Sequence, residues 1–419
     1  AALIHLFHVE TAAKRRYRGA ASAPERLGVV GGGQMGAGIA STAVAHGLPA
    51  VVRDIDPERL DQARERAGQA GPHAADLLRT TTEWEGFAAA DIVVEAVLEL
   101  PELKRETLRL IDAQVGADAL ITTNTSAIPV ASLAGAVSHP QRFMGTHFFS
   151  PVEKMPLLEL VPHLGTSEET VARAGGLGRA LGKVPVVVAD YPGFYTSRVY
   201  ARWLIEGLRL LADGADPAAI DSEAKAIGFP VGPLQACDEV TLELVRDASV
   251  VQVAQRVFLD RLDVPAVQDL LEALISAGHR GKRFGQGFYA YVDGRRSGID
   301  PGLARSVSEA VATPGTGVAA GASGERLLLA FVTESLLCWD DATLCHPDDG
   351  DLAATFGIGF PRGLGGPFHW TDRHGAHTVL ERIQAQDGTA FPTGTTLPQL
   401  AAEGATFATL SRRALPGRR

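Results

Sequence analysis

A histidine and a glutamate on two neighbouring apolar segments are the best candidates in this sequence for acid–base chemistry. His147 ends the segment Arg142–His147, and Glu159 follows 12 residues later inside Leu157–Val161. An imidazole can accept a hydroxyl proton near neutral pH, and a carboxylate beside it would fix the ring tautomer and stabilise the imidazolium. Two prolines between the segments favour a chain reversal that pairs the two side chains, and an acid in so apolar a run is costly unless it is paired. Spacing alone leaves a second interpretation, a core histidine with ordinary hydrogen bonds.

A glycine-rich turn near residue 30 predicts a dinucleotide site. The apolar run Leu27–Val30 leads into Gly31-x-Gly33-x-x-Gly36 and a helical pattern, an order that points helical N–H groups at a pyrophosphate. Asp54 ends the next apolar run, where a carboxylate binds a ribose hydroxyl and repels a 2′-phosphate. NAD is therefore expected in preference to NADP, although two nearby arginines make that preference moderate. The alternative to a dinucleotide site is a glycine turn with a purely structural role. The turn residues predicted to contact the cofactor are Gly31, Gly33, Gln34, Met35 and Gly36.

The elements around these residues predict an α/β Rossmann-type domain followed by all-α domains. Residues 26–190 alternate strand and helix patterns, which is typical of a mostly parallel sheet. Residues 191–291 are expected to form a first helical domain, and 325–415 a second. A Gly-, Ala-, Ser- and Pro-rich stretch at 292–324 predicts a linker, and residues 1–25 predict a linker helix. The expected strands are Leu27–Val30, Ala50–Asp54, Asp91–Val97, Ala119–Thr123, Arg142–Phe149, Leu157–Val161 and Val184–Ala189.

The two helical blocks contain a repeated motif. Ala226–Pro233 reads AIGFPVGP, and Gly357–Leu364 reads GIGFPRGL. Two copies are too few for a solenoid, so the repeat predicts a duplicated helical domain whose halves pack on each other. In the first copy the expected helices are Thr196–Asp213, Pro217–Ala226, Leu234–Leu262 and Val267–Ala277.

The composition argues against several classes of protein. The chain has 39 Lys+Arg against 49 Asp+Glu and no long basic block, so nucleic acid is not an expected partner. No apolar run reaches the roughly 18 residues of a membrane helix. The cysteines Cys237, Cys338 and Cys345 make no disulfide framework and suit a reducing cytoplasm, which is the expected location. No metal site is expected, because metal-ligand spacing with matching acids is lacking around His279, His346, His369, His374 and His377.

The ordered motifs resemble the L-3-hydroxyacyl-CoA dehydrogenase family, and most of all the dehydrogenase part of bacterial fatty-acid oxidation complex α-subunits. The resemblance covers essentially the whole chain and includes the glycine turn and both helical repeats. Its other motifs are Val94–Val97, Asn124–Ser126, His147–Glu159 and Pro192–Phe194. It implies NAD-dependent oxidation of L-3-hydroxyacyl-CoA to 3-ketoacyl-CoA in fatty-acid β-oxidation.

The resemblance also implies roles for single residues. His147 would be the general base for the 3-hydroxyl, and Glu159 its orienting partner. Ser126 would form a hydrogen bond with the substrate oxygen, with an ordinary N-cap or turn serine as the alternative, and Ser197 would reach the substrate carbonyl. The residues implied to lie near the cofactor are Glu99, Lys104, Asn124, Ser150 and Arg283. For Lys104 a solvated charge on a helix face is the alternative, and for the arginine a surface cation.

Several positions depart from the family pattern. Ser150 and Ser197 stand where single-function members usually have Asn, and a serine keeps a hydroxyl but loses the second partner and the reach of an amide. These forms look like those of some multifunctional bacterial chains, so we do not interpret them as inactivating. Only 41 residues separate Asp54 from Glu95, so the helical excursion usual in the family is expected to be trimmed, which predicts a more open CoA or adenine end.

We therefore expect the dehydrogenase part of a multifunctional enzyme. The chain begins without Met inside a helical pattern, which predicts a linker helix or a piece of a longer polypeptide. A non-catalytic, crystallin-like NAD-binding relative is the alternative, as is a related β-hydroxyacid dehydrogenase, for which no catalytic lysine is evident. Expected partners are an acyl-CoA substrate, a thiolase subunit, and a second copy or pseudo-dimer through the duplicated helical domains.

Overall fold

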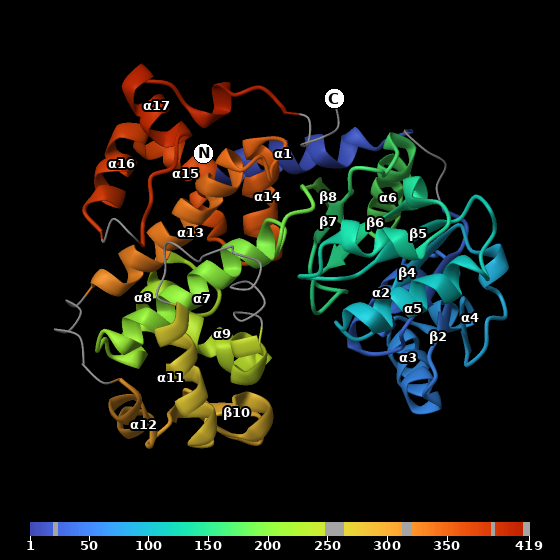
Figure 1. The fold of residues 1–419 in the computed structure, drawn as a ribbon, viewed down its shortest axis with the longest axis horizontal. Coiled ribbons are helices and arrows are strands. Elements are labelled where there is room, and N and C mark those ends of the chain that lie inside the picture. The colour runs from blue at the N-terminus through green and yellow to red at the C-terminus, as the bar shows by residue number, and fades with distance from the viewer. Residues whose placement is uncertain (20–23, 248–263, 312–320, 387–389, 414–419) are drawn as a thin grey trace. The chain divides into compact units, whose positions relative to one another are not determined.

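The chain forms two compact units (Figure 1). The sheet unit comprises residues 4–195, 342–357 and the C-terminal residues from 412; the helical unit comprises residues 1–3, 196–341 and 358–411. The computed structural model describes residues 1–19, 24–247, 264–311, 321–386 and 390–413. Among these, no helix combines the length and apolarity needed to cross a membrane.

The sheet unit is built on an eight-stranded sheet in the order β3-β2-β1-β4-β5-β6-β7-β8. The first six strands are mutually parallel, β7 runs antiparallel to β6, and β8 is parallel to β7. The strand order reverses between β1 and β4, and open α/β sheets bind ligands at such a switch point. This confirms the predicted Rossmann-type fold. The strands are β1 (Leu27–Val30), β2 (Ala50–Arg53), β3 (Leu78–Thr81), β4 (Ile92–Glu95), β5 (Leu120–Thr123), β6 (Phe143–Phe148), β7 (Leu157–Val161) and β8 (Val184–Val187).

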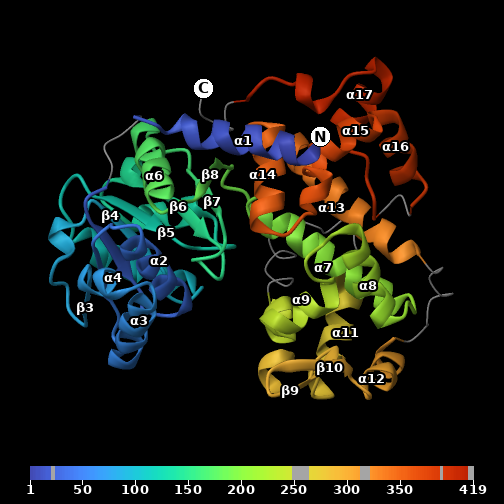
Figure 2. The same ribbon diagram turned by 180° about the vertical axis from the view of Figure 1, so that it is seen from behind.

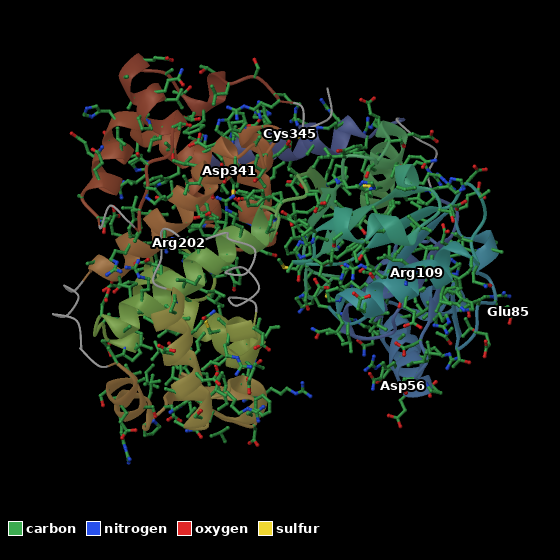
Figure 3. All side chains as sticks on the ribbon, viewed as in Figure 1. Asp56, Glu85, Arg109, Arg202, Asp341 and Cys345 are labelled. Carbon is green, nitrogen blue, oxygen red and sulfur yellow. The ribbon has the colours of Figure 1, made fainter. Side chains whose placement is uncertain are left out.

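Helices cover both faces of this sheet (Figure 2). One face packs against α2, α3 and α6 through Ile39, Leu60 and Leu177, whereas α5 contacts β4 and β5. Local signals set the helix starts: Asp56, labelled in Figure 3, caps α3 by accepting a hydrogen bond from Glu58 N at 3.0 Å. The helices are α2 (Gln34–Ala45), α3 (Pro57–Gln69), α4 (Pro72–Asp76), α5 (Pro101–Asp112) and α6 (Glu168–Ala180).

Strand β3 is absent from the sequence-based prediction. It lies at the edge of the sheet, paired only with β2, and reads LRTT with no fully buried residue. An edge strand that buries so little carries a weak hydrophobic signal. With α3 and α4 it fills the short segment between Asp54 and Glu95.

Two helices remote in sequence also belong to the sheet unit, α1 (Ala2–Arg16) and α14 (Pro347–Gly357). Helix α14 contacts β7 and β8, although the sequence placed its residues in the second helical block. Arg16 bonds the fully buried Asp349 at 2.9 Å, and His5 lies 2.9 Å from Asp351, so α1 is tied to α14. The predicted N-terminal helix is therefore a packed element of this unit.

The helical unit confirms the predicted helical character of the C-terminal region, while the predicted domain bounds 191–291 and 325–415 stay predictions. Helix α7 carries Arg202, labelled in Figure 3, which is buried and bonds Glu206 at 2.8 Å. Much of the predicted helix Leu234–Leu262 lies outside the described residues. The helices are α7 (Thr196–Ala212), α8 (Pro217–Ile227), α9 (Pro233–Val240), α11 (Val264–Ser276), α12 (Leu303–Ala310), α13 (Ala322–Asp340), α15 (Pro367–His374), α16 (Ala376–Gln384) and α17 (Thr396–Glu403).

The two copies of the repeated motif meet reciprocally inside this unit. A Cβ built on Gly228 would lie 3.2 Å from Pro361, and one built on Gly359 would lie 3.0 Å from Pro230. Reciprocal contacts of this kind are those of an approximate two-fold arrangement. They agree with the expectation that the halves pack on each other, while the duplication itself stays a prediction.

The predicted linker at 292–324 is wrong for the described part of that stretch. Strands β9 (Tyr289–Val292) and β10 (Arg295–Ile299) form an antiparallel hairpin, and α12 follows. The turn residues Asp293 and Gly294 both have positive φ, 50° and 71°, as a type I′ hairpin turn requires. An Asp-Gly pair is typical of a hairpin turn and could have predicted these strands. The prediction of a linker rested instead on the Gly-, Ala-, Ser- and Pro-rich composition of the whole stretch.

Candidate active site

His147 and Glu159 form a buried pair at the carboxyl end of β6. The antiparallel register of β6 and β7 places the two residues directly opposite each other. Nδ1 of His147 lies 2.7 Å from Oε2 of Glu159, and the two residues are 7% and 0% exposed. The carboxylate therefore holds the Nδ1 proton and leaves Nε2 with a lone pair.

Aromatic rings enclose the imidazole. The ring of His147 lies 4.4 Å from that of Phe149 and 5.9 Å from that of Phe194, centroid to centroid. Asn124, in the loop after β5, accepts a hydrogen bond at Oδ1 from Phe148 N at 2.9 Å, which ties the ends of β5 and β6 together. The base is thus held in a mostly apolar setting that strengthens its electrostatic contact with the carboxylate.

A second cluster centres on the carboxylate of Glu99. It accepts hydrogen bonds from Ser126 N at 2.9 Å and Ala127 N at 3.1 Å, and its other oxygen lies 3.4 Å from Lys104 Nζ. Burial raises the pKa of Glu99, but the charge of Lys104 and these hydrogen bonds outweigh it and hold the pKa below its usual range. Ser126 is exposed, and Thr125 makes the turn in its place, since Thr125 Oγ1 accepts from Ile128 N at 2.9 Å.

Lys104 is not a solvated helix-face charge, and that alternative is wrong. Its side chain is fully buried, and Nζ donates to Glu95 Oε1 at 2.9 Å and to Val97 O at 3.3 Å. Helix α5 turns Lys104 inward because it shares a face with the buried Leu108 and Ile111. Glu95, at the end of β4, is a site residue that sequence analysis missed, although a charge in that apolar strand demanded a partner.

The glycine turn between β1 and α2 is built for a close approach. Gly31 has φ 108°, and a Cβ there would lie 2.5 Å from Ala96 O; a Cβ on Gly36 would lie 1.8 Å from Gly31 O. Gly33 is the N-cap of α2, and no side chain among the described residues caps the first N–H groups of the helix. A Cβ on Gly33 would meet nothing within 4 Å. The turn therefore presents open space beside the uncapped N-terminal N–H groups of α2, which fits a dinucleotide pyrophosphate.

Asp54 and a cavity of about 620 Å³ extend the turn. Asp54 follows β2 and accepts hydrogen bonds from Gly32 N at 2.6 Å and Asp56 N at 3.0 Å. Its carboxylate stands in the cavity wall at the point where a ribose would follow the pyrophosphate. The other lining residues on the two sides of the cavity are Val30, Gly31, Gly33, Gln34, Met35, Arg53, Ile55, Asp56, Arg59, Ala96, Val97, Leu98, Leu103, Glu106, Thr107 and Leu110.

The structure thus brings together most of the predicted site residues, all within the sheet unit. Gln34 also donates from Nε2 to Ser150 Oγ at 2.9 Å, which links the turn to the loop after His147. Ser197 and Arg283 lie in the helical unit, on α7 and in the 3₁₀ turn Lys282–Phe284. Their proposed contacts with substrate and cofactor stay predictions.

Together, the parallel sheet, the glycine turn with its acid, and the histidine at the strand ends define a Rossmann-type dinucleotide-binding dehydrogenase. The model of the 3-hydroxyacyl-CoA dehydrogenase NAD binding domain matches residues 26–191, and that of the C-terminal domain matches 193–291. The chain belongs to the 3-hydroxyacyl-CoA dehydrogenase family. NAD is accordingly its cofactor, as the sequence predicted.

Relatives agree with this assignment. The fatty acid oxidation complex subunit alpha of Shewanella sp. (strain MR-4) is 36% identical, over 97% of this chain and 60% of the relative, so the chain spans 60% of that protein's length. The solved (S)-3-hydroxybutyryl-CoA dehydrogenase PaaH1 from Ralstonia eutropha is 31% identical with TM-score 0.60, over 65% of this chain and 100% of that one. The 3-hydroxybutyryl-CoA dehydrogenase from Escherichia coli K12, at 22% identity and TM-score 0.75 over 91% of this chain and 99% of that one, shares the fold.

Proposed function

We propose that this chain oxidises L-3-hydroxyacyl-CoA to 3-ketoacyl-CoA with NAD in fatty-acid β-oxidation, as the dehydrogenase part of a larger multifunctional polypeptide. The observation that carries the proposal is the buried contact of 2.7 Å between His147 and Glu159 at the carboxyl end of the sheet. A non-catalytic NAD-binding protein would need the glycine turn but not this pair.

The cavity supports a definite placement of NAD. Its pyrophosphate would lie over Gly33 at the start of α2, and Asp54 would accept a hydrogen bond from a ribose hydroxyl. Ile55, Leu98 and Leu110 have exposed side chains at the cavity wall and would cover the adenine ring. When bound, NAD supplies the acceptor for the hydride that leaves C3 of the substrate.

The protein's own contribution is to move one proton. Nε2 of His147 accepts the proton of the substrate 3-hydroxyl as the C3–H bond breaks, which leaves a C3 carbonyl and an imidazolium. Glu159 keeps the Nδ1 proton in place and stabilises the positive charge that forms on the ring. In the reverse direction the same imidazolium returns the proton to the new alkoxide oxygen.

Further residues would position the substrate and the nicotinamide end of the cofactor. We place the Ser126 hydroxyl on the substrate oxygen, held there by the bond between Ser126 N and Glu99. Lys104 would act through Glu99, because its own ammonium is buried. Asn124 and Ser150 would line the cofactor side. Ser197 would contact the substrate carbonyl and Arg283 the cofactor.

The wider setting follows from the relatives and the residues. The matched α-subunits belong to a complex, which supports a partner subunit, and we propose a thiolase in that role. The reciprocal packing of the repeated motifs supports a duplicated helical domain that acts as a pseudo-dimer. The cysteines among the described residues are buried and form no disulfide with one another, which supports a reducing compartment such as the cytoplasm.

Loss of NADH absorbance with acetoacetyl-CoA as substrate tests the proposal, followed by 3-ketoacyl-CoA substrates of increasing chain length. We expect turnover by the wild-type chain and almost none by His147→Gln, with NADH affinity retained in both. NADH binding without turnover by the wild type would instead favour the non-catalytic relative. Equal turnover by His147→Gln would refute the assignment of the base.

A further inference from the structure

A ring of hydrogen bonds connects the glycine turn to the loop that joins β6 and β7, residues 149–156. Glu153 accepts two hydrogen bonds from one guanidinium, from Arg66 Nε at 2.6 Å and Nη2 at 2.7 Å. The remaining nitrogen, Nη1, donates to the main-chain oxygen of Gln34 at 2.8 Å. Gln34 closes the ring, because its Nε2 donates to Ser150 Oγ at 2.9 Å. Three segments far apart in sequence are thereby joined at the first turn of α2.

Gly38 explains how these segments come so close. A Cβ at this position would lie 2.9 Å from Val152 Cγ2 and 3.0 Å from Arg66 Nη2. Because glycine has no Cβ, both the loop and the guanidinium can lie directly on α2. The same absence of a side chain leaves the guanidinium free to reach Glu153 and Gln34 together.

The importance of this ring is not expected to lie in stability. The side chains of Arg66 and Glu153 are 26% and 33% exposed, and ion pairs with this much exposure contribute little to stability. A bidentate guanidinium–carboxylate contact adds geometric specificity instead. Burial raises the pKa of Glu153, but the hydrogen bond and charge of Arg66 outweigh this and hold the pKa below its usual range, so the carboxylate is charged at neutral pH.

The position of this loop affects the positions of His147 and Glu159. It begins directly after β6, which ends with His147 and Phe148, and it leads into β7, which carries Glu159. Within it, the main-chain amides of Lys154 and Met155 both donate to Pro151 O at 3.0 Å, so the loop is folded tightly on itself. A displacement of the loop therefore moves the ends of both strands that form the His–Glu pair.

We propose that Arg66 and Glu153 are positioning residues that couple occupancy of the glycine turn to the orientation of His147. The inference rests on the proposed function, because it takes NAD to occupy that turn. A phosphate bound by the first N–H groups of α2 restrains Gln34. Arg66 carries this restraint to Glu153, and so to the loop that follows the base. The cofactor thus helps to align the residue that takes the substrate proton.

Hydrogen exchange tests this coupling without any turnover. In the wild type we expect NADH to slow exchange of the amides in residues 149–156. In Arg66→Gln and Glu153→Gln this NADH-dependent slowing should shrink by about tenfold. This is the size expected from a typical interaction free energy between residues in contact. Arg64→Gln is the matched control, since it removes an exposed ion pair with Asp61 from the same helix and should behave as the wild type.

Kinetics separates positioning from a merely structural role. Arg66→Gln and Glu153→Gln should each lower kcat about 3- to 30-fold. The double variant should be no slower than the slower of the two single variants. The melting temperature should stay near that of the wild type. Arg66→Lys should recover little, because an ammonium keeps the charge but cannot reach all three acceptors in a fixed plane.

Two results would overturn the inference, and they are distinguishable. Wild-type slowing of exchange in both Arg66→Gln and Glu153→Gln would overturn the coupling even if the chain is an active dehydrogenase. Failure of the wild type to bind NADH would overturn the proposed function and the coupling with it. Should Arg66→Gln fail to fold, the isosteric Glu153→Gln carries the test alone.

Discussion

Replacing Glu159 with glutamine should remove most of the activity while leaving the cofactor site intact. Glu159 is fully buried and its Oε2 lies 2.7 Å from His147 Nδ1, so water cannot take the place of the carboxylate. Glutamine keeps the shape of the side chain but carries no charge. Its amide N–H can also donate to Nδ1, which favours the tautomer whose proton is on Nε2, where the reaction needs a lone pair.

The size of the effect follows from these two losses. A hydrogen bond to a charged group contributes about 1.5–3 kcal/mol, and losing that from the transition state slows a reaction about 10- to 160-fold. The unfavourable tautomer adds to this loss, because the base must first be converted to its reactive form. Together they should lower kcat by about 10²- to 10⁴-fold, the range expected for an oriented general base.

The assay follows NADH consumption with acetoacetyl-CoA, alongside direct measurement of NADH binding by fluorescence. We expect the NADH dissociation constant of Glu159→Gln to stay within about twofold of the wild type, since Glu159 is not among the residues that line the cofactor cavity. Glu168→Gln, which neutralises an exposed carboxylate in the first turn of α6, is the control. The double variant with His147→Gln should be no slower than the slower single variant. A Glu159→Gln enzyme that turns over as fast as the wild type would refute the reasoning.

Three further predictions concern the turn, a buried ion pair and the helical unit. Gly33→Ala should weaken NADH binding about tenfold with little change in melting temperature, because its Cβ enters open space where the phosphate binds; calorimetry and thermal melting measure the two effects separately. Lys104→Met should lower the free energy of unfolding by about 3–5 kcal/mol, because Glu95 stays buried without its partner, and adding Glu95→Gln should recover much of the loss in urea titrations. Burial raises the pKa of Asp238 from 3.8 to about 6. The folded chain therefore binds more protons than the unfolded chain between pH 4 and 6, and this carboxyl's contribution to stability falls as pH rises through that window, by up to about 3 kcal/mol. Comparing urea unfolding of the wild type and Asp238→Asn from pH 4 to 7 should reveal the difference, and parallel curves would contradict it.

The central strands were predictable because their residues leave few alternatives. Leu27–Val30 and Leu157–Val161 are observed with the predicted bounds, since each apolar run ends at residues that break or reverse the chain. Leu78–Thr81 was not predictable in the same way. This strand lies at the edge of the sheet and is only partly buried, so it lacks a clear hydrophobic pattern. Its pairing with β2 in the folded chain, and not its own sequence pattern, makes it a strand.

The His–Glu pair was predictable, but the partner of Lys104 was not. Two prolines and an acid in an apolar run together suggested that Glu159 returns to His147, and the register confirms this contact. Finding the partner of Lys104 required two steps. Lys104 had first to be placed on the buried face of α5, and its charge then had to be matched with an acid in a neighbouring strand. Glu95 was visible in the sequence, but strand order decides that it ends beside that helix.

The register of β6 and β7 is the feature on which the chemistry depends. Every residue of Leu157–Val161 is buried, so the hydrophobic pattern of β7 does not by itself distinguish one register from another. A slip of one residue would turn the Glu159 carboxylate to the opposite face, away from the imidazole and without a partner, at a cost of several kcal/mol. The His–Glu contact therefore selects the register as well as the tautomer. The loop at 149–156 limits how far β7 can shift along β6. The hydrogen bonds that hold this loop through Arg66 and Glu153 can therefore influence the proton transfer at His147.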